Sequence, residues 1–144
     1  MAWFAMPNGV QSVPFVYAEQ YVRQTAIYSG ANSLPKLDNP VGGTAKIGDK
    51  DQLTVSGTIT GEDVRAALFF DKGTGLLTRA AFYYPSVLGS TAQIDDFSNY
   101  RKVGGGLLPS TVTIHSASGD IEEQFRSIRE DSKIDAKLFE APKG

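Results

Sequence analysis

The sequence predicts a mainly β protein, with an antiparallel meander following one helix near the N-terminus. Residues 97–114 have the pattern of a strand, a tight glycine turn and a second strand running back beside the first. Similar period-two patterns precede and follow this run, whereas only residues 16–28 have helical spacing. A chain of 144 residues is long enough for one buried core. We therefore predict a single α+β domain over residues 1–144.

Within this domain we expect a helix and loop over residues 1–43, an antiparallel sheet over 44–131, and a closing turn and tail over 132–144. The aromatic start at Trp3-Phe4 is more typical of a buried strand than of a chain terminus. The chain is therefore expected to be a truncated or processed part of something longer.

The predicted helix has Ala18, Tyr21 and Val22 on one face and Glu19 and Arg23 on the other. The loop of residues 29–43 is rich in Gly, Pro and Asn, which favour turns. From residue 44 onward the period changes to two, which is the period of a half-buried strand.

The expected strands come in quick succession. They cover residues 44–47, 53–59, 64–70, 76–84, 92–103, 108–115 and 121–127. The strand over 76–84 is apolar on both faces, which indicates a central position, and Pro85 to Ser90 is expected to end it. Alternation breaks between Ile94 and Phe97, which predicts a β-bulge there. Residues 134–139 are expected to form one closing helical turn.

Composition limits the possible functions. The formal net charge is −2 and the basic residues are scattered singly, so the sequence gives no electrostatic reason to expect nucleic acid or acidic lipid. The chain has no cysteine, which excludes disulfides, thiolate metal sites and covalent haem attachment within it. No apolar run approaches the roughly 20 residues of a membrane-spanning helix. Residues 1–7 lack the pattern of a signal peptide.

The patterns that could indicate catalysis have simpler interpretations. The run from Asp71 to Gly75 resembles the phosphorylated signature of P-type ATPases with two residues exchanged, but it also fits a hairpin turn. The glycines of 104–106 are likewise expected to form a turn rather than a phosphate loop. His115 is the only histidine and is expected at the surface. The pair Asp95-Asp96 should point to opposite, solvated faces of a strand. We therefore predict no enzymatic activity, no metal and no cofactor.

The aromatic residues concentrate on neighbouring predicted strands. Ordinary core packing is the simpler interpretation, and an apolar groove in a curved sheet is the functional one. For the second interpretation, the candidate ligand-binding residues are Phe70, Phe82, Tyr84, Phe97, Val112 and Ile114.

A set of motifs over residues 41–142 resembles a bacterial family of outer-membrane lipoprotein-sorting (lipoprotein carrier)-like domains. The motifs are Thr44 to Asp49, Leu68 to Asp71, Gly75 to Arg79, Phe97 to Arg101 with Val103, Gly105 and Pro109, and Ile134 to Phe139 with Pro142. Gly104 stands where that family usually has Asp, and Gly-Gly still fits the turn.

The resemblance implies a strongly curved antiparallel half-barrel with helices against its concave face, in which the carriers hold acyl chains. Similar segments follow cytochrome c domains in chains labelled photosynthetic reaction-centre cytochrome subunits. Against this family, the chain is expected to lack the N-terminal helix and first strands, which would leave the concavity incomplete. The resemblance transfers no catalytic residues.

Two functions remain open at this point. The first is a non-catalytic, periplasmic or otherwise extracytoplasmic domain that binds a lipid acyl chain or another apolar ligand. The second is an accessory subunit docked on a membrane-associated electron-transfer complex, with a protein as its partner.

Overall fold

The computed structural model describes residues 2–6, 9–13 and 34–129, and all regular structure within these ranges is β-strand. The chain divides into two compact units, one of residues 1–34 with 129–144 and one of residues 35–128. The mainly β class is therefore confirmed. The expected helix at 16–28 and the closing turn at 134–139 lie outside the described residues and stay predictions.

The first unit contains a two-stranded antiparallel hairpin. Strand β1 (Ala2–Met6) pairs with β2 (Gly9–Val13), with Ala2 opposite Val13 and Met6 opposite Gly9. The aromatic pair Trp3-Phe4 lies in β1, consistent with the preference of aromatic residues for strands.

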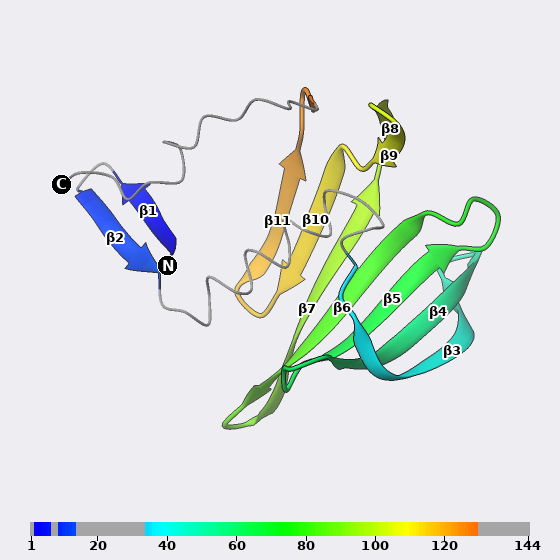
Figure 1. The fold of residues 1–144 in the computed structure, drawn as a ribbon, viewed down its shortest axis with the longest axis horizontal. Helices are drawn as coiled ribbons and strands as arrows, with labels where there is room; N and C mark the ends of the chain where they lie inside the picture. The colour runs from blue at the N-terminus through cyan, green and yellow to red at the C-terminus, as the bar shows by residue number, and fades with distance from the viewer. Residues whose placement is uncertain (1, 7–8, 14–33, 130–144) are drawn as a thin grey trace. The chain divides into compact units, whose positions relative to one another are not determined.

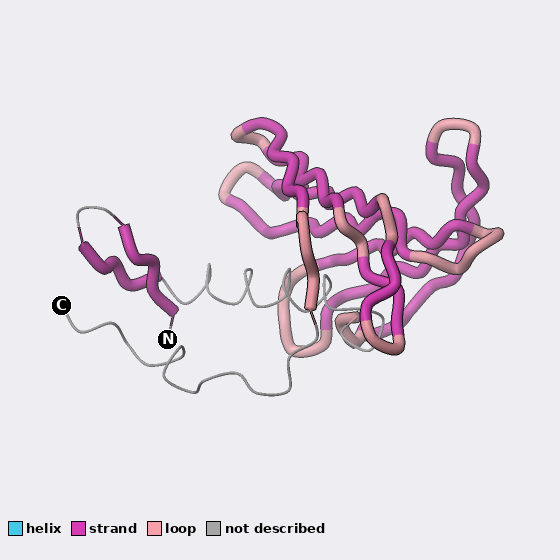
Figure 2. The backbone as a smooth tube through the Cα atoms, turned by 90° about the horizontal axis from the view of Figure 1, so that it is seen from above, coloured by secondary structure: helices cyan, strands magenta, loops and turns pink. Residues whose placement is uncertain are grey.

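The second unit is built on a seven-stranded antiparallel sheet in the order β11-β10-β7-β6-β5-β4-β3 (Figure 1). Its strands are β3 (Leu37–Ile47), β4 (Lys50–Ile59), β5 (Arg65–Asp71), β6 (Leu77–Ser86), β7 (Gly89–Ser98), β10 (Thr111–Ser116) and β11 (Gly119–Gln124). Strands β3 and β11 are the edges and do not pair with each other, so the sheet is open rather than closed into a barrel. Figure 2 shows the loops of this unit at the ends of its strands.

The strand expected over residues 92–103 is interrupted. Strand β7 ends at Ser98, and Asn99 adopts a φ of 54°, which turns the chain out of the sheet. A separate hairpin follows, formed by β8 (Arg101–Val103) and β9 (Gly106–Leu108) around the predicted glycine turn. The chain then re-enters the sheet as β10, which pairs with β7.

The hairpin of β6 and β7 is longer than expected. Pro85 does not end the strand, because β6 continues to Ser86 and β7 begins at Gly89. Strand β5 pairs with β6 only as far as Tyr83, so Pro85 has no neighbour on that side. A proline is tolerated where its missing N–H faces no partner strand.

Strand β3 begins at Leu37, within the stretch expected to be a loop. It is an edge strand, so Pro40 interrupts no pairing on its outer side. Its register with β4 shifts between Asp38 and Val41, and Asn39 has a φ of 48° at this bulge.

The bulge expected between Ile94 and Phe97 is absent. Strand β7 pairs in unbroken register with β6 and with β10 across this stretch. The apolar pattern was misleading because Gln93 and Asp95 occupy buried positions beside Phe97, on the side that we expected to be apolar. A register shift lies instead between β5 and β6, where Thr78 is the extra residue opposite Phe69 and Phe70.

The core lies mainly on one face of this sheet. The buried apolar residues of the described part are Ile59, Val64, Ala66, Leu68, Ala80, Ala81, Phe82, Phe97 and Val112. Strand pairing places Ala66 beside Phe82 and Phe97 beside Val112, so the largest of these side chains share one side.

Candidate functional site: one apolar face of the sheet

The structure brings the predicted lining residues together on one face. Residues that pair directly across neighbouring strands point to the same side of a sheet, and so do alternate residues of one strand. Ala66 pairs with Phe82, Phe82 with Gln93, and Phe97 with Val112. By alternation from these pairs, the shared face contains Phe70, Phe82, Tyr84, Phe97, Val112 and Ile114.

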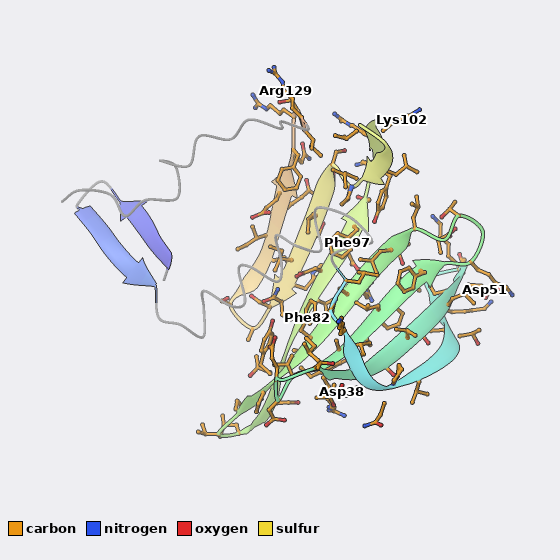
Figure 3. All side chains as sticks on the ribbon, in the orientation of Figure 1. Asp38, Asp51, Phe82, Phe97, Lys102 and Arg129 are labelled. Atoms are coloured by element: carbon orange, nitrogen blue, oxygen red, sulfur yellow. The ribbon has the colours of Figure 1, made fainter. Side chains whose placement is uncertain are left out.

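Burial is deepest at the middle of this face. Phe82 and Val112 are fully buried and Phe97 is 5% exposed, and Figure 3 labels Phe82 and Phe97 on the middle strands. Phe70, Tyr84 and Ile114 are half-buried. The half-buried side chains are therefore the ones that an incoming molecule can contact without displacing the centre of the core.

The apolar face extends beyond the predicted residues at both sides. Leu53 of β4 pairs with Phe70 and is 44% exposed. Ile121 of β11 pairs with Ile114 and is 58% exposed. Sequence reasoning placed both in strands but did not assign them to this face. They add an accessible aliphatic side chain to this face at β4 and at β11, and Asp95 of β7 lies between Ile114 and Ala80.

Polar side chains also lie on this face. Glu123 of β11 pairs with Val112 and is half-buried, and Gln93 and Asp95 of β7 are more deeply buried. Gln93 is 6% exposed and Asp95 fully buried, and the Gln93 amide donates a hydrogen bond of 2.9 Å to Asp95 Oδ1. The expectation that Asp95 is solvated is wrong. Its neighbour Asp96 points to the other face, as predicted, and is about one-third exposed. Alternation counted back from Phe97 would have placed Asp95 and Gln93 on the buried side of the strand.

Comparisons with models of protein families, with curated proteins and with solved structures found no match to this chain. Among the residues that the structure describes, no group of three or more His, Asp or Glu side chains is arranged to hold a metal ion. Within the same ranges no helix is long and apolar enough to span a membrane.

The opposite face has a polar ladder across four strands. Arg79 of β6 donates to both carboxylate oxygens of Asp96 on β7, with 2.7 Å between Nη2 and Oδ2. His115 of β10 lies between Asp96, at 3.3 Å from Nε2, and Asp120 of β11, at 2.9 Å from Nδ1. The hydrogen bond to Asp120 and the charges of both carboxylates raise the pKa of His115. Both ring nitrogens face carboxylates, so His115 is not poised to activate a nucleophile.

The turn after β5 is a hairpin turn, as predicted. Asp71 Oδ1 accepts hydrogen bonds from the backbone N–H groups of Gly73 and Thr74 and from the Thr74 hydroxyl, at 2.8–3.1 Å. These hydrogen bonds lower the pKa of Asp71. The carboxylate therefore fixes the local turn, which is the ordinary role of Asp at such a position.

The tip of the hairpin formed by β6 and β7 is an exposed apolar feature that sequence reasoning missed. Val87 and Leu88 are essentially fully exposed, at 102% and 96%. Residues 80–94, which form most of this hairpin, include no charged side chain. The run from Pro85 to Ser90 reads as a loop in sequence, which concealed the projecting pair.

Proposed function

We propose that this protein is a non-catalytic binding domain that takes a lipid acyl chain, or another apolar ligand of similar shape, on the apolar face of its seven-stranded sheet. The observation that carries this proposal is the shared face of Phe70, Phe82, Tyr84, Phe97, Val112 and Ile114. Aromatic and aliphatic residues lining one surface are the usual composition of small-molecule sites.

The energetics favour a long apolar ligand over a small polar one. Each methylene group removed from water contributes roughly 0.8 kcal/mol, so an acyl chain gains binding free energy along its length. The half-buried members of the face and the accessible Leu53 and Ile121 offer contacts on β4, β5, β6, β10 and β11, with β7 lying between β6 and β10. A chain-shaped ligand makes use of such an extended strip, whereas a compact ligand does not.

The sequence resemblance supports the same proposal. A lipoprotein-carrier-like domain would hold acyl chains in the concavity of a half-barrel, and an open antiparallel sheet is compatible with that shape. A periplasmic or otherwise extracytoplasmic location in a bacterium is proposed on this resemblance alone.

Native mass spectrometry of the protein purified gently from its source membranes tests this function. We expect an added mass of lipid size that is lost after organic extraction and restored by incubation with lipid. Protein that carries no adduct and takes up none from added fatty acid or phospholipid would contradict the proposal.

A second candidate is an accessory subunit docked on a membrane-associated electron-transfer complex. The exposed tip formed by Val87 and Leu88 favours it, because two fully exposed aliphatic side chains gain roughly 1.5–3 kcal/mol each on full burial against a partner. The test compares the wild type with a Val87→Ser, Leu88→Ser variant for co-purification with a haem protein. Equal recovery of haem with both proteins, or no haem with either, would contradict docking through this tip.

A further inference from the structure

A polar pocket of about 340 Å³ lies where the end of β7, the start of β10 and the end of β11 meet. Its lining residues are Asn99, Arg101, Ser110, Thr111, Gln124, Phe125 and Arg126. Backbone hydrogen bonds join these segments, from Ser110 to the Asn99 carbonyl at 3.2 Å and from Phe125 to the Ser110 carbonyl at 2.9 Å. The pocket is thus built on paired strand ends rather than on a free loop.

The floor of the pocket is polar and already hydrogen-bonded. Ser110 and Thr111 are 2% and 9% exposed. The Ser110 hydroxyl donates to the Asn99 carbonyl at 2.6 Å, and the Asn99 amide donates to the Thr111 hydroxyl at 3.0 Å. These contacts hold the floor rigid, which leaves the two guanidinium groups at the rim as the principal donors for a ligand.

The rim is positively charged. Arg101 and Arg126 both line the pocket, no carboxylate does, and neither guanidinium forms an ion pair or hydrogen bond with a residue that the structure describes. Glu123 precedes Gln124 in β11 but pairs with Val112, so it lies on the opposite face of the sheet from Gln124. Glu122 accepts a hydrogen bond from Gln124 at 2.7 Å. Two guanidinium groups that line one pocket repel each other, and an anion between them reduces that repulsion.

Charge is also unevenly distributed along the chain. The two segments that form the pocket, residues 97–111 and 124–128, contain Arg101, Lys102 and Arg126 and no acidic residue. These are three of the chain's 14 basic residues. The rest of the chain therefore has 11 basic and 16 acidic residues. Figure 3 labels Lys102 at this same end of the sheet. The pocket is therefore locally cationic in a protein of net negative charge.

We propose that Arg101 and Arg126 bind a phosphate group in this pocket, carried either by a phospholipid headgroup or by a small phosphorylated molecule. The planar guanidinium matches phosphate oxygens with two parallel hydrogen bonds, and two such groups can bind one phosphate from two sides. This site goes beyond the apolar face and does not depend on it.

The experiment is a two-dimensional ¹⁵N NMR titration of the full chain with inorganic phosphate, against sodium chloride at equal ionic strength. We expect phosphate to shift the backbone amides of Asn99, Arg101, Thr111 and Phe125 saturably, and chloride to leave them unchanged. Equal shifts with both salts would overturn the proposal, because they would indicate general screening rather than a site.

Three variants isolate the two guanidinium groups. Arg101→Gln with Arg126→Gln should weaken phosphate binding at least about tenfold, since it removes both charge-assisted contacts. Lys36→Gln with Lys72→Gln changes the net charge equally at exposed positions outside the pocket and should leave binding unchanged. Arg101→Lys with Arg126→Lys keeps the charge but not the fork geometry, so binding as tight as in the wild type would overturn the bidentate site.

The source of the phosphate is distinguished by sedimentation with vesicles of phosphatidylcholine and of phosphatidylglycerol. Binding to phosphatidylglycerol vesicles that inorganic phosphate inhibits, and that the double Gln variant lacks, assigns a headgroup. Phosphate binding without vesicle binding assigns a soluble phosphorylated ligand. Vesicle binding that is identical in the double Gln variant, together with no NMR response to phosphate, would overturn the site.

Discussion

At the scale of single residues, His115 is a surface side chain whose two ring nitrogens contact carboxylates on the two neighbouring strands. It joins β10 to Asp96 on β7 and to Asp120 on β11, and Asp96 is in turn paired with Arg79. Sequence reasoning predicted a surface histidine on a polar face, which is correct to the extent that its side chain is 36% exposed. Its partners could not be predicted, because they depend on strand register.

The pH dependence of His115 can be predicted from the direction of its shift. Its pKa is raised in the folded protein, chiefly by the hydrogen bond to Asp120, so folding favours the protonated ring. This stabilisation is fully present below the unfolded pKa of about 6.5 and is lost as pH rises through the folded pKa. We expect the free energy of unfolding, measured with urea, to fall as pH rises through this window.

A His115→Gln variant should lose this pH dependence. Because the chain has one histidine, its ring protons give a single NMR titration that can be followed without assignment. A pKa at or below 6.5 in the folded protein would contradict the ladder geometry.

Tyr100 offers a second test at the residue scale. Its hydroxyl donates to the Leu77 carbonyl at 2.6 Å, and burial raises its pKa to about 12. A Tyr100→Phe change should destabilise the fold by about 1 kcal/mol, the usual net value of one hydrogen bond. The rise in absorbance at 295 nm up to about pH 11 should be the same in the wild type and the variant, since Tyr100 is still protonated there. A smaller rise in the variant would show that Tyr100 ionises normally.

At the scale of elements, alternation was enough to predict most strands. The errors occurred where contacts between strands overrode the preference of a residue for a turn or for the surface. Pro85 was expected to end a strand and Pro40 to lie in a loop, but each is in a strand at a place where a neighbouring strand is missing. The false bulge in β7 arose because Gln93 and Asp95 are polar residues in core positions. Pairing partners and burial decide both cases, and neither is visible in one sequence.

The contact between β3 and β4 can be tested at Gly57. A Cβ atom there would lie 2.7 Å from the Asp38 carbonyl oxygen and 3.1 Å from Leu37 Cβ, so the edge strand would have to move. We expect Gly57→Ala to destabilise the protein by roughly 1–3 kcal/mol, as overpacking does. Gly105→Ala is the matched control, because nothing lies within 4 Å of a Cβ at that position. Equal unfolding midpoints in urea for both variants would contradict this close approach.

At the scale of the whole molecule, the apolar, polar and cationic side chains of the described sheet lie in different places. One face has most of the buried apolar side chains, the other has the ladder of Arg79, Asp96, His115 and Asp120, and one end has the cationic pocket. The six candidate residues were named from the sequence, and strand pairing places them on one side of the sheet. Sequence reasoning missed the pocket because its arginines are 25 residues apart in the chain and only strand pairing brings them together.

The two faces of β5 provide the most direct test of the proposed function, since Phe69 and Phe70 are adjacent, both half-buried and point to opposite sides. The measurement is the affinity of a fluorescent hexadecanoic acid for the wild type, Phe70→Ser and Phe69→Ser, with urea unfolding to confirm that each is folded. Phe70→Ser should weaken binding about tenfold, because it removes an aromatic side chain from the apolar face, whereas Phe69→Ser should leave the affinity nearly unchanged. Equal affinities for the two folded variants, or no binding by the wild type, would contradict a ligand site on this face.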